Sequence, residues 1–167
     1  MNNIIRSLSL ILVLLTLSLS FVGCGETPEE TDVWPMSHTS GEITITLTNE
    51  FFVIDPENST ARFSSRSVTV TAQKTLFTTL GTSVLTPASY AREVLSTHGI
   101  TAEVYETDAY AYFSFNETVD GAEYYYKDFC YKSEDAYWVV QFLCPISVRS
   151  AYDTQFDVWA STVIFDE

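Results

Sequence analysis

The feature that most constrains the fold is a run of aromatic and β-branched residues towards the C-terminal end of the chain. Residues 136–144 contain one polar residue, Gln141, and no charged residue follows them before Arg149. A run of this length and composition is typical of a strand buried on both faces in the middle of a sheet. We therefore expect a sheet with this strand at its centre and other elements packed above and below it.

Short connections around this run predict antiparallel strands. Strand-like segments that are separated by only a few turn residues pair with their neighbours as a meander. Alternating apolar residues predict further strands near the N-terminal end, where Ile43, Ile45 and Leu47 point to one side. The expected strands are residues 42–48, 60–64, 67–73, 100–105, 110–116, 122–131 and 136–144.

Two amphipathic helices are expected to cover this sheet. Thr86 is a good N-cap residue, the proline after it suits the first helical position, and Gly99 suits a left-handed stop. Near the C-terminus, large apolar residues recur every three or four positions from Tyr152 to Val163. With 46 % hydrophobic residues the chain can bury one core. The predicted fold class is α+β, an antiparallel β-sheet covered by helices, in residues 41–167.

The N-terminal region has the features of a secretory signal. Arg6 is the only charged residue before Glu26, and residues 8–22 form an almost unbroken run of apolar residues and serine. This run is shorter than the roughly 20 apolar residues that a membrane-spanning helix needs. It ends at Val22, and a single glycine separates it from Cys24.

The Phe-Val-Gly-Cys motif that ends at Cys24 resembles the lipobox of bacterial lipoproteins. In a lipobox a small residue precedes a cysteine that receives lipid, with acyl chains such as palmitate, and becomes the new N-terminus. Phenylalanine replaces the usual leucine here. We expect residues 1–23 to be a signal peptide, Cys24 to carry the lipid and residues 24–40 to form a flexible tether. The expected location is the extracytoplasmic side of the cell membrane; an ordinary signal peptide and an uncleaved anchor are the alternatives.

The charge of the chain excludes partners that present many phosphates. Removing residues 1–23 takes away Arg6, one of eight basic residues, and none of the 22 acidic ones, so the formal charge falls from −14 to −15. Such a surface repels nucleic acid and anionic head groups. Solubility explains the charge, and a calcium-binding module is an alternative, although no carboxylate spacing matches a calcium loop.

The remaining cysteines are expected to be free. Cys130 and Cys144 lie on either side of the expected turn at residues 133–135. If the two strands pair around this turn, Cys130 faces Val139 and Cys144 faces Tyr125, several positions apart. A disulfide requires Cα atoms within about 7 Å, so both thiols are interpreted as small buried hydrophobic groups.

No catalytic or metal-binding constellation is present in the sequence. His38, in the expected tether, and His98, at a helix end, are the only histidines, and there is no Gly-x-Ser-x-Gly motif. We therefore expect a protein that is not an enzyme and has no cofactor. The competing hypothesis is an envelope hydrolase that uses carboxylates near Glu103, Glu106 and Asp108.

Tyrosines crowd four adjacent strands of the expected sheet. Their rings can stack on sugars or pack against peptide, and tyrosine is favoured at interfaces. Packing between strands is the alternative explanation. The candidate recognition surface consists of Tyr110, Tyr112, Tyr124, Tyr125 and Tyr126.

Two apolar stretches carry a family resemblance. Residues 135–144 and 156–165 resemble small lipoproteins of Gram-positive bacteria, and residues 42–51 fit the same pattern. Their domain is similar to the α/β/α sandwich of the photosystem II protein PsbP and the Ran-binding import factor Mog. The resemblance implies helices on both faces of an antiparallel sheet and transfers no catalytic residue. The expected function is a lipid-anchored, non-enzymatic binding or accessory lipoprotein whose partner is an envelope protein or polymer.

Overall fold

The structure is a computed structural model, and it describes residues 32–54 and 59–166. The expected signal peptide, Cys24 and the first part of the expected tether lie outside these residues. The elements below belong to one unit, Val33–Glu167. Among the described residues, no helix combines the length and the hydropathy that crossing a membrane requires.

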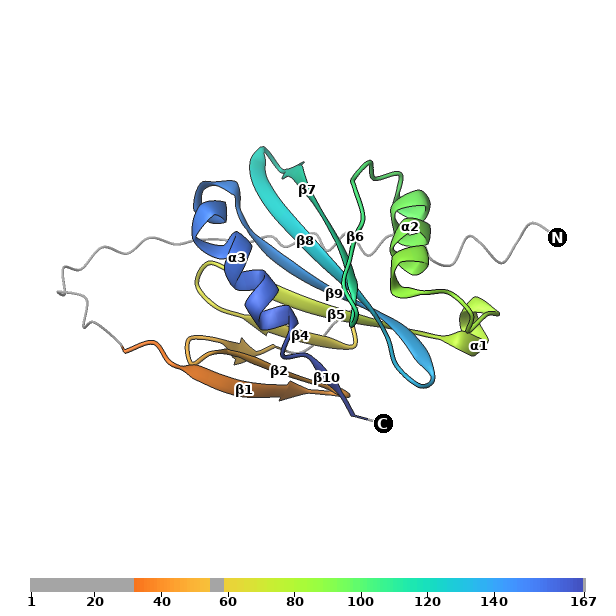
Figure 1. The fold of residues 1–167 in the computed structure, drawn as a ribbon. Helices are drawn as coiled ribbons and strands as arrows, with labels where there is room; N and C mark the ends of the chain where they lie inside the picture. Colours follow the sequence, from red (N-terminus) through yellow and green to blue (C-terminus); the bar gives the residue numbers. More distant parts are fainter. Residues whose placement is uncertain (1–31, 55–58, 167) are drawn as a thin grey trace. The chain divides into compact units, whose positions relative to one another are not determined.

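A seven-stranded antiparallel sheet forms the centre of this unit (Figure 1). Its strand order is β3-β4-β5-β9-β8-β7-β6, so the run at residues 136–144 lies in the middle, as predicted. One face of this strand is fully buried, whereas Val139, Gln141 and Leu143 on the other face are half-buried. The strands are β3 (Phe52–Val53), β4 (Ala61–Ser64), β5 (Thr69–Leu76), β6 (Tyr105–Glu106), β7 (Ala111–Val119), β8 (Ala122–Lys132) and β9 (Ala136–Pro145).

Helix α2 (Pro87–His98) covers part of one face and begins and ends where the sequence predicts. Thr86 Oγ1 accepts a hydrogen bond from the backbone N–H of Ser89 at 3.1 Å. Gly99 ends the helix with a φ of 66°, a left-handed conformation that glycine adopts without steric cost. Tyr90 of α2 stacks on Tyr137 with ring centroids 4.7 Å apart. The helix packs mainly over β7 and β8, which explains why the same face of β9 is only half-buried.

Helix α3 (Arg149–Ala160) crosses the opposite face of the sheet (Figure 1). Phe156 stacks on Phe142 of β9 with centroids 5.0 Å apart, and Trp159 and Ala160 are also buried. The predicted C-terminal helix is therefore confirmed, although Val163 lies beyond its end. A short 3₁₀ turn (Ile146–Val148) precedes it, and the single-turn helix α1 (Phe77–Leu80) follows β5.

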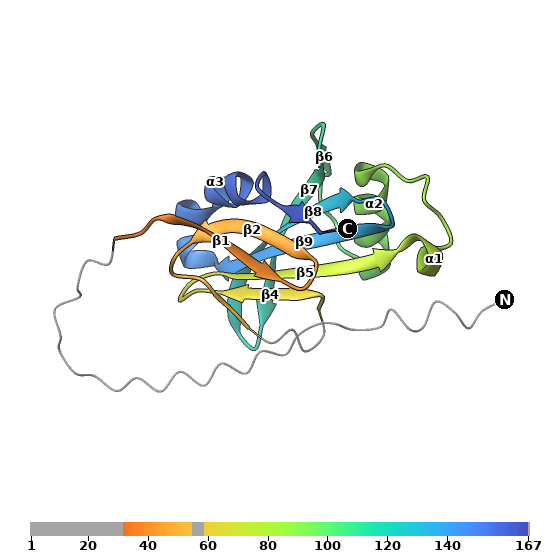
Figure 2. The same cartoon turned by 90° about the horizontal axis from the view of Figure 1, so that it is seen from below.

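A second sheet of three strands lies beside α3, and the sequence did not predict it as a separate sheet. Strands β1 (Pro35–Ser40), β2 (Ile43–Thr48) and β10 (Ile164–Phe165) pair in the order β1-β2-β10. The alternation in β2 is as predicted, because Ile43, Ile45 and Leu47 are buried in the core shared with α3. Figure 2 shows β1 and β2 in front of the larger sheet.

Two expectations about the chain path are wrong. Residues 35–40 are not part of a flexible tether, because β1 pairs along its whole length with β2. His38 is accordingly buried, and its Nε2 lies 2.9 Å from the carbonyl oxygen of Thr48. Residues 100–104 are also not a strand, since pairing with β7 begins only at Tyr105.

The pairing of β8 with β9 confirms the prediction about the cysteines. Cys130 lies opposite Val139 and Cys144 opposite Tyr125, as expected. Both thiols are free and buried, and burial raises the pKa of each. A raised pKa keeps a thiol protonated and unreactive, so both cysteines act as small apolar side chains.

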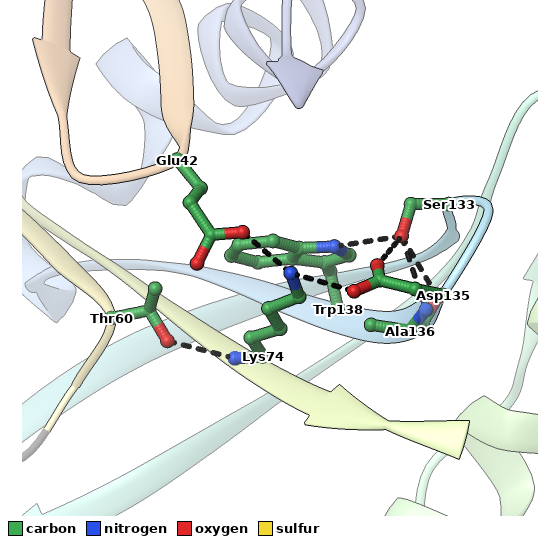
Figure 3. Close-up of polar contacts among 7 residues, drawn as sticks. All are labelled: Glu42, Thr60, Lys74, Ser133, Asp135, Ala136 and Trp138. Carbon is green, nitrogen blue, oxygen red and sulfur yellow. Dashed lines mark hydrogen bonds and ion pairs between the residues drawn. The ribbon is translucent and has the colours of Figure 1, made fainter. Parts of the chain in front are cut away.

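Lys74 connects the two sheets (Figure 3). Its ammonium group pairs with Glu42, in the turn between β1 and β2, and with Asp135, in the turn between β8 and β9, the latter at 3.0 Å. The same group lies 5.5 Å from the centre of the Trp138 ring, whose N–H donates to Ser133 Oγ at 3.3 Å. The hydrogen bond from Lys74 lowers the pKa of Asp135. One cation thus holds the end of the small sheet against the centre of the large one.

Candidate binding site: an aromatic hollow beside helix α3

A hollow of about 310 Å³ lies between α3, the end of β2, the turn before β3 and the turn after β4. Three aromatic side chains line it, from the turn after β2 and from α3. Polar groups from four positions line the rest of it. The aromatic lining is Phe51, Tyr152 and Trp159, the polar lining is Thr48, Glu50, Ser65 and Gln155, and Val33 and Ala151 complete it.

The aromatic rings hold each other in place. Phe51 meets Trp159 edge to face with ring centroids 5.2 Å apart, and Tyr152 lies 6.1 Å from Trp159. Phe51 is positioned by a turn in which its backbone N–H donates to the carbonyl oxygen of Thr48 at 3.1 Å. Tyr152, Gln155 and Trp159 share one side of α3 because they are three and four residues apart. The hollow is therefore built on packed elements.

A charged cluster lies on the other flank of α3. Lys127 of β8 is almost completely buried, and its Nζ lies 3.1 Å from Asp153 Oδ1 and 2.7 Å from Asp157 Oδ1. Tyr125 donates to Asp153 Oδ1 at 2.6 Å. Burial raises the pKa of Asp153, but the hydrogen bonds from Tyr125 and Lys127 outweigh it, so this pKa is lowered. Asp157 Oδ1 forms an ion pair with Lys127 but has no hydrogen-bond partner among the described residues, so Lys127 fastens α3 to the sheet mainly through its hydrogen bonds to Asp153.

Asp128, the next residue of β8, points to the opposite face of the sheet and is the most perturbed acid. It is 4 % exposed, and desolvation raises its pKa to about 7 although Gln141 Nε2 donates to Oδ2 at 3.2 Å. Its Oδ1 has no hydrogen-bond partner in the part of the chain that the structure describes. The pairing register places it in one cross-strand row with Gln141, Thr71 and Arg62. This carboxyl does not line the hollow.

The five tyrosines of the expected recognition surface do not form one surface. Tyr110 and Tyr112 pack against the core on the α3 side, and Tyr125 is buried beneath α3. Tyr124 and Tyr126 lie on the opposite face, where Tyr126 is buried against β7 and the same burial raises its pKa to about 12. The five rings divide between the two faces of the sheet, with Tyr125 packed under α3 and Tyr126 against β7, so the prediction of a shared recognition surface is corrected.

The acidic residues of the hydrolase hypothesis are exposed to solvent and do not form a cleft with the hollow. Glu103, Glu106 and Asp108 are exposed, and none of them lines the hollow. Glu103 accepts a hydrogen bond from Tyr105 at 2.8 Å. His98 is exposed at the end of α2. Among residues 32–54 and 59–166, no three His, Cys, Asp or Glu side chains gather so that they could hold a metal ion.

Sequence reasoning missed the hollow and both buried charged groups. Tyr152 and Trp159 were predicted only as the apolar face of a helix, and Phe51 comes from a turn 100 or more residues away. No local pattern signals that these three meet. The sequence did contain a signal for the two charged groups, because Lys127 and Asp128 interrupt a run of mainly aromatic residues. Since neighbouring strand residues point to opposite faces, this signal predicts one charged side chain on each face of the sheet.

Comparison with known proteins finds similar solved structures but no matching family. No protein-family model matches the chain, and no curated protein matches it significantly. The solution structure of CyanoP, the PsbP of the cyanobacterium Synechocystis sp. PCC 6803, is similar with a TM-score of 0.44 and 13 % identity, over 86 % of this chain and 98 % of that one. A crystal structure from Bacteroides thetaiotaomicron VPI-5482 is similar with a TM-score of 0.47 and 10 % identity, over 77 % of this chain and 50 % of that one. The structural neighbours thus include a PsbP-like protein, as the sequence resemblance led us to expect.

Proposed function

We propose that this chain is a lipid-anchored, extracytoplasmic binding or accessory protein without catalytic activity, and that its ligand binds in the aromatic hollow. The lining of the hollow is the observation that carries this proposal. Phe51 and Trp159 are each only 5 % exposed, so the half-buried ring of Tyr152 is the aromatic surface offered to a ligand. Such a ring beside hydroxyl and amide groups suits a sugar ring or an apolar peptide side chain. An envelope polymer or envelope protein presents such groups.

The positions of the ionisable groups favour binding over catalysis. A hydrolytic site needs acids within reach of one another at a cleft. Among the residues that the structure describes, Glu50 is the only carboxylate that lines the hollow. Asp128, whose pKa is strongly raised, lies on the other face of the sheet, and Asp153 and Asp157 are paired with Lys127. We therefore propose that these acidic groups have structural roles and that the ligand binds in the hollow.

The first test concerns the anchor. We expect radiolabelled palmitate to enter the protein in the cells that make it, and the Cys24→Ala variant to lose this label completely and to appear in the soluble extracytoplasmic fraction. Cys144→Ala is the matched control, because that thiol is buried in β9 and should leave labelling unchanged. Equal labelling of the Cys24→Ala variant would contradict the assignment of the lipid to this residue.

The second test concerns the hollow. Placing the photo-crosslinking residue p-benzoylphenylalanine at position 155 should give a discrete crosslinked product in the envelope of the producing cell, because Gln155 lines the hollow. The same residue at position 97, which is exposed on α2, serves as the control. Crosslinking of equal yield and pattern from both positions would show that the hollow is not the binding site.

A further inference from the structure

One unpaired carboxylate, that of Glu50, gives the hollow its charge. Among the described residues, no Lys, Arg or His side chain forms an ion pair with it, whereas Asp153 and Asp157 on the other flank of α3 both pair with Lys127. Glu50 is exposed and lines the hollow together with its neighbour Phe51. Its negative charge is therefore available to a ligand.

The turn that carries Glu50 is fixed by backbone hydrogen bonds. The N–H of Phe51 donates to the carbonyl oxygen of Thr48 at 3.1 Å and closes the turn. On its outer side, the backbone N–H of Asn49 donates to the carbonyl oxygen of Trp34 at 3.0 Å, and the backbone N–H of Trp34 donates to Asn49 Oδ1 at 3.0 Å. These bonds keep the backbone of Glu50 in place beside the hollow.

No positive charge balances this carboxylate in the described lining of the hollow. Arg149 lies close in sequence to the lining residues of α3, but its guanidinium group lies 4.2 Å from the centre of the Tyr125 ring, on the other flank of the helix. Arg66 follows Ser65 and does not line the hollow. Because the whole chain also carries a formal charge of −14, the surface attracts cations and repels anions.

The neutral groups of the lining fit a ligand that carries hydroxyl groups. The hydroxyl of Ser65 is engaged, because it accepts from the backbone N–H of Val68 at 3.1 Å. Thr48 and Gln155 supply a further hydroxyl and an amide beside the half-buried ring of Tyr152. A sugar ring can pack its C–H face on such an aromatic ring while its hydroxyls bond to these polar groups. A lysine side chain offers an ammonium group but no hydroxyls.

We infer that the ligand of the hollow is an amino sugar whose protonated amine lies between the Glu50 carboxylate and the Tyr152 ring. This inference rests on the proposed function of the hollow as the binding site. An ammonium group gains a charge-assisted hydrogen bond from a carboxylate and a cation–π contact from an aromatic ring. Acetylation of the amine removes both interactions and leaves the sugar ring unchanged, so the free amine determines the specificity.

The test follows the indole N–H signals of the full lipidated protein, labelled with ¹⁵N at its three tryptophans and purified in detergent. Trp159 lines the hollow and reports binding, and Trp138, which does not line it, is the internal reference. Glucosamine at pH 6 should shift the Trp159 signal with a dissociation constant about three- to tenfold lower than that of N-acetylglucosamine. Glucuronate, which has the same ring with a negative charge, should cause no shift.

Glu50→Gln should reduce the preference for glucosamine by about two- to fivefold and leave the weaker binding of N-acetylglucosamine unchanged. Glu93→Gln is the matched control, because Glu93 is exposed on α2 and does not line the hollow. This variant should keep the full preference. Circular dichroism melts of both variants confirm that they are folded.

The inference and the proposed function fail in different ways. Equal affinity for all three sugars, or a preference for glucosamine that survives intact in the Glu50→Gln variant, overturns the role of the amine and leaves the hollow as a binding site. A Trp159 shift with Nα-acetyl-lysine methylamide but with no sugar also overturns the inference and assigns the hollow to a peptide. If no probe shifts Trp159 while position 155 still gives its discrete crosslink, the amino-sugar inference alone is overturned. If that crosslink is absent as well, both proposals fail.

Discussion

Replacing Phe156 by alanine is expected to lower the free energy of unfolding by about 3–5 kcal/mol. The side chain is completely buried and stacks on Phe142 and, at 6.3 Å, on Tyr125, so its removal leaves a cavity between α3 and the centre of the sheet. This loss is large compared with the roughly 5–15 kcal/mol that stabilises a typical domain. Equilibrium unfolding in urea, followed by circular dichroism, measures the change.

Val158→Ala on the same helix is the matched control for this prediction. Val158 is two residues from Phe156 but is 52 % exposed, so its truncation should change the free energy of unfolding by no more than about 0.5 kcal/mol. Alanine favours the helix at both positions, so a similarly small change in both variants would mean that the Phe156 side chain is not packed in the core. It would contradict the packing of α3 on the sheet.

The second large effect is expected at Asp128, where Asp128→Asn should stabilise the protein at pH 8 and have little effect near pH 4. The folded protein holds this carboxyl with a pKa of about 7, compared with an ordinary value of 3.8. Because the folded pKa is the higher one, folding takes up a proton between these values, and stability falls as the pH rises from about 4 to about 7. Above pH 7 the buried charge costs on the order of 4 kcal/mol. Asparagine removes the charge and keeps an oxygen that can accept from Gln141.

Urea unfolding of the wild type and of the Asp128→Asn variant at pH 8 and at pH 4.5 measures this prediction. At each pH, the free energy of unfolding of the wild type is subtracted from that of the variant, so that the contributions of other titrating groups cancel. Asp108→Asn removes one charge from an exposed position and should change stability by less than about 0.5 kcal/mol at either pH. An Asp128→Asn variant that gains nothing at pH 8 would show that Asp128 is not buried as a charge. The same variant should retain the hollow, because Asp128 does not line it.

Local signals in the sequence were sufficient for the helices and the central strands. Thr86 and Gly99 mark the ends of α2 because caps satisfy backbone groups that only helix ends leave free. The largely apolar run of β9 marks the sheet centre, and the short turn before it determines the register that separates Cys130 from Cys144. These features depend on neighbouring residues, so they could be inferred without coordinates.

The small sheet could not be predicted in the same way. Strand β1 has little apolar alternation and follows a proline-containing segment, which is typical of a tether. Its strand conformation depends on β2 and on the burial of His38 against Phe51 and Phe63, at ring distances of 6.4 Å. Strand β10, with two residues, exists because α3 ends beside β2, where Thr162 Oγ1 accepts from the backbone N–H of Thr46 at 3.0 Å. Pairing partners this far apart leave no local pattern.

By itself the sequence determined the fold class, the pairing of the central strands, the free thiols and the expectation of a lipid on Cys24, because periodicity, caps, turn lengths and motifs are properties of contiguous residues. The tertiary structure alone decided that Phe51 joins Tyr152 and Trp159 around a hollow, that Lys127 and Asp128 point to opposite faces, and that the tyrosines do not share a surface. Those outcomes depend on which faces of distant elements meet, and that is settled by packing.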